Sequence, residues 1–200
     1  MQVLAFDADG VVICPPQRFF ARISHELCLP PESGREFFGG VFQDCLAGRA
    51  DLREVITPLL SRWGWLGSVD DFLQRWFEEE HCLNEPILDM IQTLRGRGHR
   101  CVIATNQERY RLAYMKNQMG FGGLFDKVFG SADVGAVKPA IDFFDEVTRR
   151  LRVRPSDIIF WDDTLQNVRR ARTYGWNAEC FSGMEEFRRT LELHTGCDWE

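Results

Sequence analysis

The sequence predicts an α/β protein built on a parallel sheet with helices on both faces. Five short apolar segments recur along the chain, and a turn or a polar stretch follows each of them. Stretches of helical periodicity, at 109–119, 140–151 and 164–174, separate the later segments. Alternation of this kind is typical of parallel sheets whose crossover connections are helices. The predicted strands are residues 3–6, 101–104, 127–129, 157–161 and 178–181, and a last helix at 184–193 precedes a polar tail.

The first two predicted strands lie too far apart in the sequence for one crossover helix. Residues 15–84 carry apolar and aromatic side chains at helical spacing, interrupted at Pro30-Pro31, Gly39-Gly40, Pro58, Gly64 and Gly67. We therefore expect an α-helical subdomain at 15–84, inserted into a core domain formed by residues 1–14 and 85–200. Its aromatic side chains are expected to pack as a core rather than to form a ligand-stacking surface. They are Phe37, Phe38, Phe42, Trp63, Trp65, Phe72, Trp76 and Phe77.

Composition narrows the classes of partner. The chain has 200 residues and a formal net charge of -6, without a concentrated stripe of lysine and arginine, which argues against a nucleic-acid partner. It has neither a run of about 18 apolar residues nor a signal peptide, so we expect no membrane association and a cytoplasmic location. The seven scattered cysteines fit free thiols in a reducing compartment. A monomer and a homodimer both remain open.

Two carboxylates, Asp7 and Asp9, come directly after the first predicted strand. In parallel α/β sheets the ligand crevice lies outside the carboxyl ends of the strands. Like charges this close repel each other, and a hard cation such as Mg²⁺, which takes oxygen ligands, compensates them most simply. The structural alternative is a turn at Asp9-Gly10 with Asp7 as a helix cap.

Further polar side chains follow the other predicted strands. Thr105 and Asn106 follow the second strand, Lys138 follows the third, and Asp162 and Asp163 follow the fourth. Each has a structural alternative as a helix cap or a surface cation. If they surround one crevice, however, these side chains could carry out phosphoryl transfer through a covalent aspartyl-phosphate. They would supply the positive charge and the hydrogen-bond donors that the phosphoryl oxygens need.

These motifs resemble those of the haloacid dehalogenase (HAD) superfamily. The resemblance is to subfamily I, the subgroup in which an α-helical cap is inserted after the first motif. The resemblance implies a Rossmann-like core, with Asp7 as the nucleophile. It also implies that Asp9 is the general acid and base, whose backbone carbonyl binds Mg²⁺. Thr105 matches the residue that holds the phosphate, with Asn106 beside it as a further substrate-binding residue, and Lys138 matches the lysine that stabilises the intermediate.

The fourth motif, Asp162-Asp163-Thr164-x-x-Asn167, is the variant DDxxxN, in which asparagine replaces the last acidic residue. This change removes no carboxylate that the aspartyl-phosphate mechanism needs. By the resemblance, Asp163 is the preferred direct ligand of Mg²⁺, and Asp162 binds it directly or through water.

The expected function is Mg²⁺-dependent hydrolysis of a small-molecule phosphate monoester. A sugar-phosphate mutase uses the same core residues and is the main alternative, whereas a 2-haloacid dehalogenase would lack the second aspartate and the metal. A non-catalytic protein with the same fold is a further alternative. Six polar residues could touch a polar or anionic leaving group, although a surface position is the expected one for any single member. They are Arg18, Arg22, Arg49, Arg53, Gln107 and Arg109.

Overall fold

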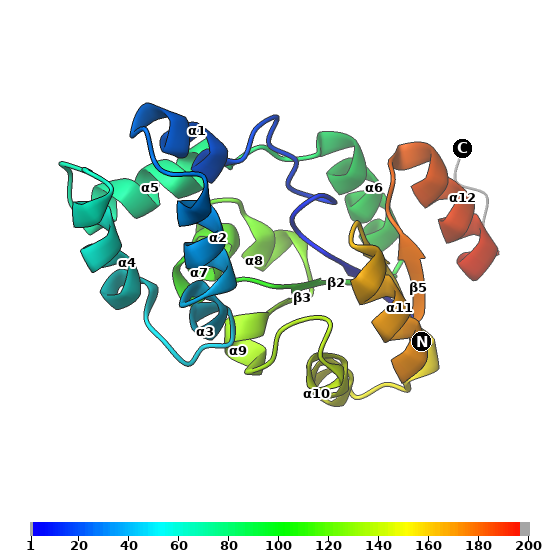
Figure 1. The fold of residues 1–200 in the computed structure, drawn as a ribbon. Coiled ribbons are helices and arrows are strands. Elements are labelled where there is room, and N and C mark those ends of the chain that lie inside the picture. Colours follow the sequence, from blue (N-terminus) through cyan, green and yellow to red (C-terminus); the bar gives the residue numbers. More distant parts are fainter. Residues whose placement is uncertain (1, 197–200) are drawn as a thin grey trace.

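A parallel sheet forms the centre of the protein, as the sequence predicts. The computed structural model describes residues 2–196, and within them the sheet has five strands in the order β3-β2-β1-β4-β5 (Figure 1). All four pairings are parallel, and β1 lies in the middle. Each strand overlaps one predicted segment. They are β1 (Val3–Phe6), β2 (Arg100–Thr105), β3 (Lys127–Gly130), β4 (Ile158–Asp162) and β5 (Asn177–Cys180).

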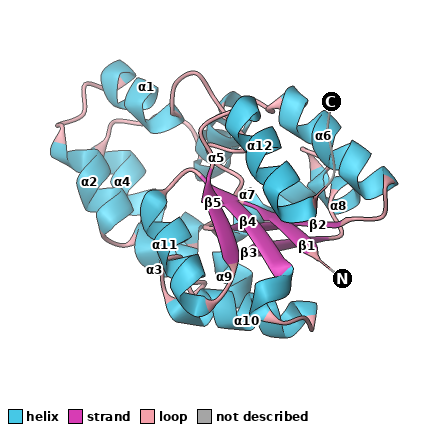
Figure 2. Cartoon of the chain, turned by 90° about the vertical axis from the view of Figure 1, so that its right-hand side faces the viewer, coloured by secondary structure: helices cyan, strands magenta, loops and turns pink. Residues whose placement is uncertain are grey.

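Side chains alternate between the two faces of the sheet and build two hydrophobic clusters. In β1, Leu4 and Phe6 contribute to one cluster, whereas Val3 and Ala5 contribute to the other. The first cluster is covered by helices α6 (Glu85–Gly96), α7 (Arg109–Asn117), α8 (Phe121–Leu124) and α12 (Met184–Thr195). Helices α10 (Ile141–Leu151) and α11 (Leu165–Tyr174) cover the second (Figure 2). A short helix α9 (Ser131–Val134) and a 3-10 turn η1 (Pro155–Asp157) complete the connections.

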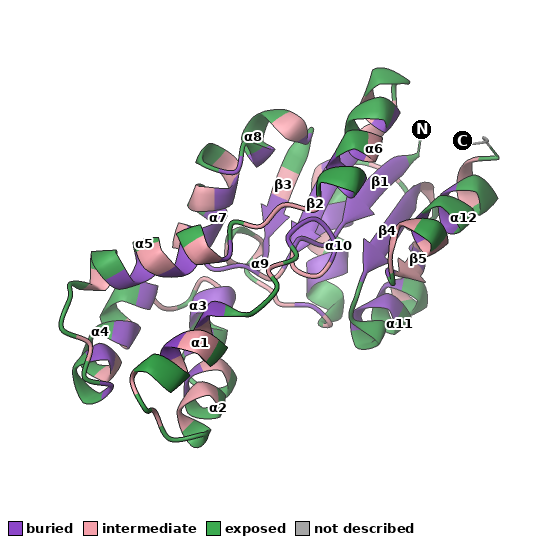
Figure 3. Ribbon diagram, turned by 90° about the horizontal axis from the view of Figure 1, so that it is seen from above, coloured by how far each residue is buried: buried purple, intermediate pink, exposed green. Residues whose placement is uncertain are grey.

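The segment between β1 and α6 is helical and has a hydrophobic cluster of its own. Its helices lie to one side of the sheet (Figures 1 and 3). Of the eight aromatic side chains expected in its core, all are buried except Phe38 and Trp65, which are partly exposed. Packing as a core is therefore their main role. The helices are α1 (Phe19–Glu26), α2 (Glu32–Gly39), α3 (Phe42–Leu46), α4 (Leu52–Arg62) and α5 (Val69–Glu79).

One predicted helix break is wrong. Gly39 ends α2 as expected, but Pro58 lies inside α4. A proline inside a helix removes one backbone hydrogen bond. Helix α4 nevertheless continues, because it buries Leu52, Ile56 and Leu60 in the hydrophobic cluster of the inserted segment.

The chain leaves and re-enters the core through two neighbouring stretches. The backbone N–H of Cys14 donates to the carbonyl of Cys82 at 2.8 Å, and that of Asn84 donates to the carbonyl of Val12 at 3.0 Å. The Asn84 side chain also donates to the carbonyl of Val11 at 2.8 Å. The two ends of the inserted segment are thus held together by hydrogen bonds.

The C-terminal helix runs two residues further than expected, to Thr195, while Cys197 and the polar tail at 197–200 lie outside the described residues. The six cysteines at described positions are free thiols. Within residues 2–196, no helix combines the length and apolar character needed to cross a membrane.

Candidate active site

Side chains from three strand ends meet at one edge of the sheet. Asp7 follows β1, Thr105 ends β2 and Asp162 ends β4. Because the strands are parallel, their carboxyl ends share this edge, and the loop before α10 brings Lys138 to it. The edge opens into a polar pocket of about 220 Å³. The pocket is lined by Asp7, Asp9, Arg18, Thr105, Asn106, Asp163, Thr164 and Asn167.

Lys138 connects two of the carboxylates. Its Nζ lies 3.0 Å from Oδ1 of Asp7 and 2.6 Å from Oδ2 of Asp162, and its side chain is fully buried. Asn106 holds the lysine backbone from both sides, since its Nδ2 donates to the Lys138 carbonyl at 3.0 Å and its Oδ1 accepts from the Lys138 N–H at 2.8 Å. The Asn106 amide therefore positions Lys138 as well as lining the pocket.

Burial shapes the protonation of these groups. The pKa of Asp7 is raised to about 7. Burial is the largest cause and the Asp162 carboxylate adds to it, while Lys138 and the Thr105 hydroxyl act in the opposite direction. Burial alone would lower the pKa of Lys138, but the two neighbouring carboxylates outweigh this effect and raise it. The lysine is therefore charged, and additional positive charge near Asp7 would favour the carboxylate form of Asp7.

The acidic residues of the edge have the composition of a metal site. Asp7, Asp162 and Asp163 each offer a carboxylate oxygen, and these oxygens lie within 4.8 Å of one another. Three carboxylates face one ammonium group, which leaves an excess of negative charge that a hard divalent cation would balance. The two oxygens of Asp162 already accept hydrogen bonds from Lys138, Asn167 and the N–H of Thr164. Asp163 is exposed and better placed to give an oxygen to the ion.

Asp9 lines the same pocket but is not part of this cluster. The chain after β1 folds into a tight turn in which the N–H groups of Val12 and Ile13 both donate to the carbonyl of Ala8. The carboxylate of Asp9 accepts hydrogen bonds from Nη1 of Arg18 at 3.0 Å and from Nε2 of Gln107 at 2.7 Å. The predicted metal contact of Asp9 concerns its backbone carbonyl and stays a prediction.

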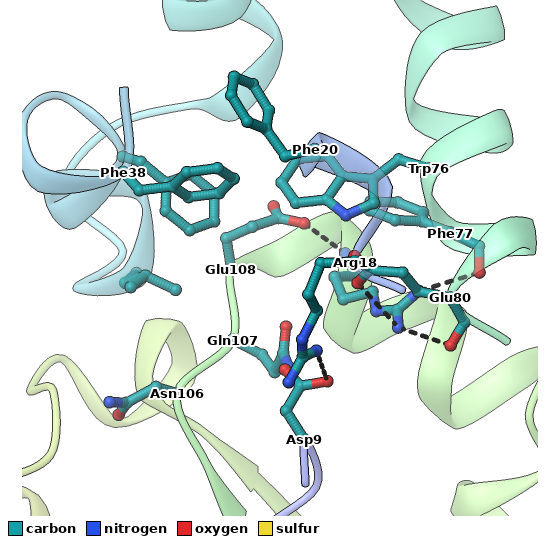
Figure 4. A pocket seen from close by; sticks show the side chains of 13 residues that line it. Asp9, Arg18, Phe20, Phe38, Trp76, Phe77, Glu80, Asn106, Gln107 and Glu108 are labelled. Carbon is teal, nitrogen blue, oxygen red and sulfur yellow. Dashed lines mark hydrogen bonds and ion pairs between the residues drawn. The ribbon is translucent and has the colours of Figure 1, made fainter. Parts of the chain in front are cut away.

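A second cavity, which we call the aromatic cavity, begins at Asp9. Its volume is about 270 Å³, and it shares Asp9, Arg18 and Asn106 with the polar pocket. Figure 4 shows aromatic side chains of the inserted helices gathered on the far side of it from Asp9. It is lined by Asp9, Arg18, Phe20, Phe38, Phe42, Leu46, Trp76, Phe77, Glu80, Asn106, Gln107, Glu108 and Arg111.

Sequence reasoning missed three buried charged residues of this cavity: Glu80, Glu108 and Arg111. The Arg111 guanidinium donates to the carbonyls of Phe77 and Glu80 at 3.0 and 3.3 Å. The Glu108 carboxylate accepts from the N–H groups of Tyr110 and Arg111 and so caps helix α7. For Glu108, the sequence offered one signal: an acidic residue directly before a predicted helix is typical of an N-terminal cap.

The six polar residues considered for contact with the leaving group divide into two sets. Arg18 and Gln107 line the aromatic cavity, whereas the other four have partners elsewhere. Arg22 pairs with Glu79, Arg49 with Asp44 and Arg53 with Asp70, and Arg109 donates to the carbonyl of Gly48.

The fold and the site together define a parallel α/β protein with an inserted group of helices and with a carboxylate and lysine site at its strand ends. A family model of haloacid dehalogenase-like hydrolases matches residues 1–175. The chain belongs to this family and is a hydrolase-type enzyme.

Two curated proteins illustrate its relatives. The bifunctional epoxide hydrolase 2 of Mus musculus is 24% identical over 225 residues, which cover 98% of this chain and 39% of that protein. The sesquiterpene phosphatase of Aspergillus oryzae is 29% identical over 86 residues, which cover 43% of this chain and 44% of that protein. The matched regions therefore span less than half the length of either relative.

Among solved structures, the protein is similar to a HAD family enzyme from Bacteroides thetaiotaomicron in complex with magnesium and inorganic phosphate. The TM-score is 0.76 at 19% sequence identity, with 92% of this chain and 96% of that chain covered. At this level of identity the likeness shows a shared fold.

Proposed function

We propose that the protein is a Mg²⁺-dependent phosphatase that hydrolyses a small-molecule phosphate monoester through an aspartyl-phosphate on Asp7. The observation that carries this proposal is the Nζ of Lys138, held 3.0 Å from Asp7 at the edge of a pocket also lined by Asp9 and Thr105. A carboxylate nucleophile must approach an anionic phosphate, and it needs fixed positive charge to do so.

The first half of the reaction uses Asp7 and Asp9. The Asp7 carboxylate attacks phosphorus, the ester P–O bond breaks, and Asp9 in its acid form gives its proton to the departing oxygen. Lys138 and the Thr105 hydroxyl stabilise the phosphoryl oxygens. Asp9 lines both the polar pocket and the aromatic cavity, which supports a role between the phosphate and the rest of the substrate.

The second half restores the enzyme. The Asp9 carboxylate removes a proton from water, the resulting hydroxide attacks phosphorus, and the bond to Asp7 breaks to release inorganic phosphate. Asp7, Asp163 and the Asp9 backbone carbonyl would hold Mg²⁺, with Asp162 as a direct or water-mediated ligand. When bound, the ion supplies positive charge that offsets the charge on the nucleophile and the phosphate.

The relatives support this choice of reaction. One is named a sesquiterpene phosphatase, and a protein of the same fold was solved with magnesium and phosphate together. We further propose that the segment 15–84 acts as a cap over the site, because it supplies most of the side chains that line the aromatic cavity.

The decisive experiment measures phosphate release from 4-nitrophenyl phosphate with Mg²⁺ and with EDTA. We expect metal-dependent release from the wild type and none from Asp7→Asn, which keeps the size of the side chain and removes the nucleophile. Asp142→Asn, which changes an exposed carboxylate on α10, is the matched control and should keep full activity. Undiminished turnover by folded Asp7→Asn would refute the proposed nucleophile.

A further inference from the structure

We propose that the substrate is the phosphate ester of an apolar alcohol, whose hydrocarbon part fills the aromatic cavity during hydrolysis. This inference rests on the proposed phosphatase function and names the class of leaving group. It differs from the option left open by the sequence, in which arginines of the inserted segment touch a polar or anionic leaving group.

The wall of the cavity that the inserted helices supply is hydrophobic. Phe20, Phe38, Phe42, Trp76 and Phe77 come from α1, α2, α3 and α5, and Figure 4 shows the labelled members around the space beyond Asp9. Rings meeting at several angles present faces and edges to an occupant, which suits apolar and unsaturated groups. A sugar would leave its hydroxyl groups without partners against such a wall.

The buried polar side chains that line the cavity already have partners within the protein. Arg111 donates to two backbone carbonyls, and Glu108 accepts from two backbone N–H groups. Oε1 of Glu80 accepts from the N–H of Phe19 at 2.9 Å, and Gln107 donates to Asp9. A hydroxylated leaving group would have to compete with these bonds for several of the hydrogen bonds it needs.

The position of the cavity fits the reaction. Asp9, Arg18 and Asn106 border both the polar pocket and the aromatic cavity, so the two spaces lie on either side of the proton donor. A phosphate near Asp7 would therefore direct its ester group past Asp9 and into the aromatic cavity. At the packing density of protein interiors, a volume of about 270 Å³ holds about ten to twelve non-hydrogen atoms.

The first test compares two phosphate esters of primary alcohols with leaving groups of similar size and opposite polarity, 4-phenylbutyl phosphate and glucose 6-phosphate. Because both leaving groups are primary alkoxides, differences in intrinsic reactivity are small. We expect kcat/KM for the phenylbutyl ester to exceed that for the sugar ester by at least tenfold. Equal or faster hydrolysis of glucose 6-phosphate would overturn the inference and leave the phosphatase function intact.

The second test measures binding without hydrolysis, by calorimetric titration with 4-phenylbutan-1-ol and with glucose. The alcohol should bind at least tenfold more tightly than glucose. Equal or weaker binding of the alcohol would overturn the inference whatever the hydrolysis assay shows. If the alcohol binds but neither 4-phenylbutyl phosphate nor 4-nitrophenyl phosphate is hydrolysed, the proposed phosphatase function fails and the apolar binding site stands.

Two variants locate the binding. Phe38→Ala removes a partly exposed ring from the cavity wall, whereas Trp65→Ala removes a partly exposed ring of the same hydrophobic cluster that does not line the cavity. We expect Phe38→Ala to weaken binding of the alcohol about tenfold, in line with the loss of a buried aromatic contact, and Trp65→Ala to leave it unchanged. Equal effects of the two changes would count against the cavity as the binding site.

Discussion

The carboxylate of Asp163 occupies the space that a side chain at Gly10 would need. A Cβ built on Gly10 would overlap Oδ2 and Cγ of Asp163, and the backbone of Gly10 has a φ of +82°, which side chains rarely tolerate. Glycine at position 10 therefore allows the turn after β1 to approach the acidic cluster.

Gly10→Ala should displace Asp163 and weaken metal binding. We expect the affinity for Mg²⁺, followed by titration calorimetry, to fall at least tenfold. Gly120→Ala is the matched control, because Gly120 also has a positive φ, of +75°, but has no atom within 4 Å of its added Cβ. Both variants should lose stability, and only Gly10→Ala should lose metal affinity. Unchanged affinity in Gly10→Ala would argue against Asp163 as a ligand.

Lys138→Met should abolish most activity and destabilise the protein. We expect kcat to fall by about 100- to 1000-fold, as for loss of a donor to a developing oxyanion. Loss of one partner of a buried ion pair typically costs about 3–5 kcal/mol, so urea unfolding in EDTA should show a large decrease in stability. Lys116→Met removes a lysine from a surface pair with Asp133 and should cost less than about 1 kcal/mol. Similar losses in the two variants would contradict the role of burial.

Gln107→Leu tests whether positioning of Asp9 contributes to proton transfer. Since Gln107 donates to Asp9 and the Asp9 carboxylate lies outside the acidic cluster, we expect kcat to fall about tenfold while the Mg²⁺ affinity is unchanged. Gln118→Leu, an exposed position at the end of α7, should behave as the wild type. A change in KM alone would instead place Gln107 among groups that only bind substrate.

Glu108→Gln should change the pH dependence of stability. Burial raises the pKa of Glu108 above its ordinary value of 4.5, although the N–H groups of Tyr110 and Arg111 lower it. The folded state then holds the proton more tightly than the unfolded state, so the wild type loses stability as the pH rises from about 4.5 through the folded pKa. The free energy of unfolding of Glu108→Gln relative to the wild type should therefore rise over this range.

Glu146→Gln provides a control of opposite sign. Hydrogen bonds from Arg149 and Arg150 lower the pKa of Glu146 to about 2, so the wild type gains stability as the pH rises from about 2 through 4.5. The relative stability of Glu146→Gln should fall over that range. Denaturant unfolding at several pH values measures both slopes, and equal slopes would contradict the assignment for Glu108.

The strands and the meeting of Asp7, Thr105 and Asp162 could be predicted from sequence because they follow from short-range patterns. A buried strand is a run of apolar residues, and the ends of parallel strands share one edge of the sheet. The pairing of Lys138 with two carboxylates follows the same logic, since it comes from a loop at that edge.

The aromatic cavity could not be predicted in this way. Periodicity assigns Phe38 and Trp76 to helices, but it does not tell whether a ring faces other rings or an open space between helix and sheet. One partner of Asp9 is also distant in sequence, since Gln107 lies 98 residues further along the chain. Such contacts depend on how α1 to α5 pack against the core. Pro58 shows the same limit, because burial of neighbouring residues outweighs its local preference.

The hydrogen bonds that join Cys14 to Cys82 and Asn84 to Val12 have an evolutionary consequence. For the sheet, the whole inserted segment is equivalent to a loop with fixed, adjacent ends. Each doubling of the length of such a loop adds only about 0.6 kcal/mol to the entropic cost of closing it. Descendants of this chain can therefore exchange, shorten or enlarge the segment while the strand ends keep their arrangement. Substrate preference and bond-breaking chemistry can then be inherited separately.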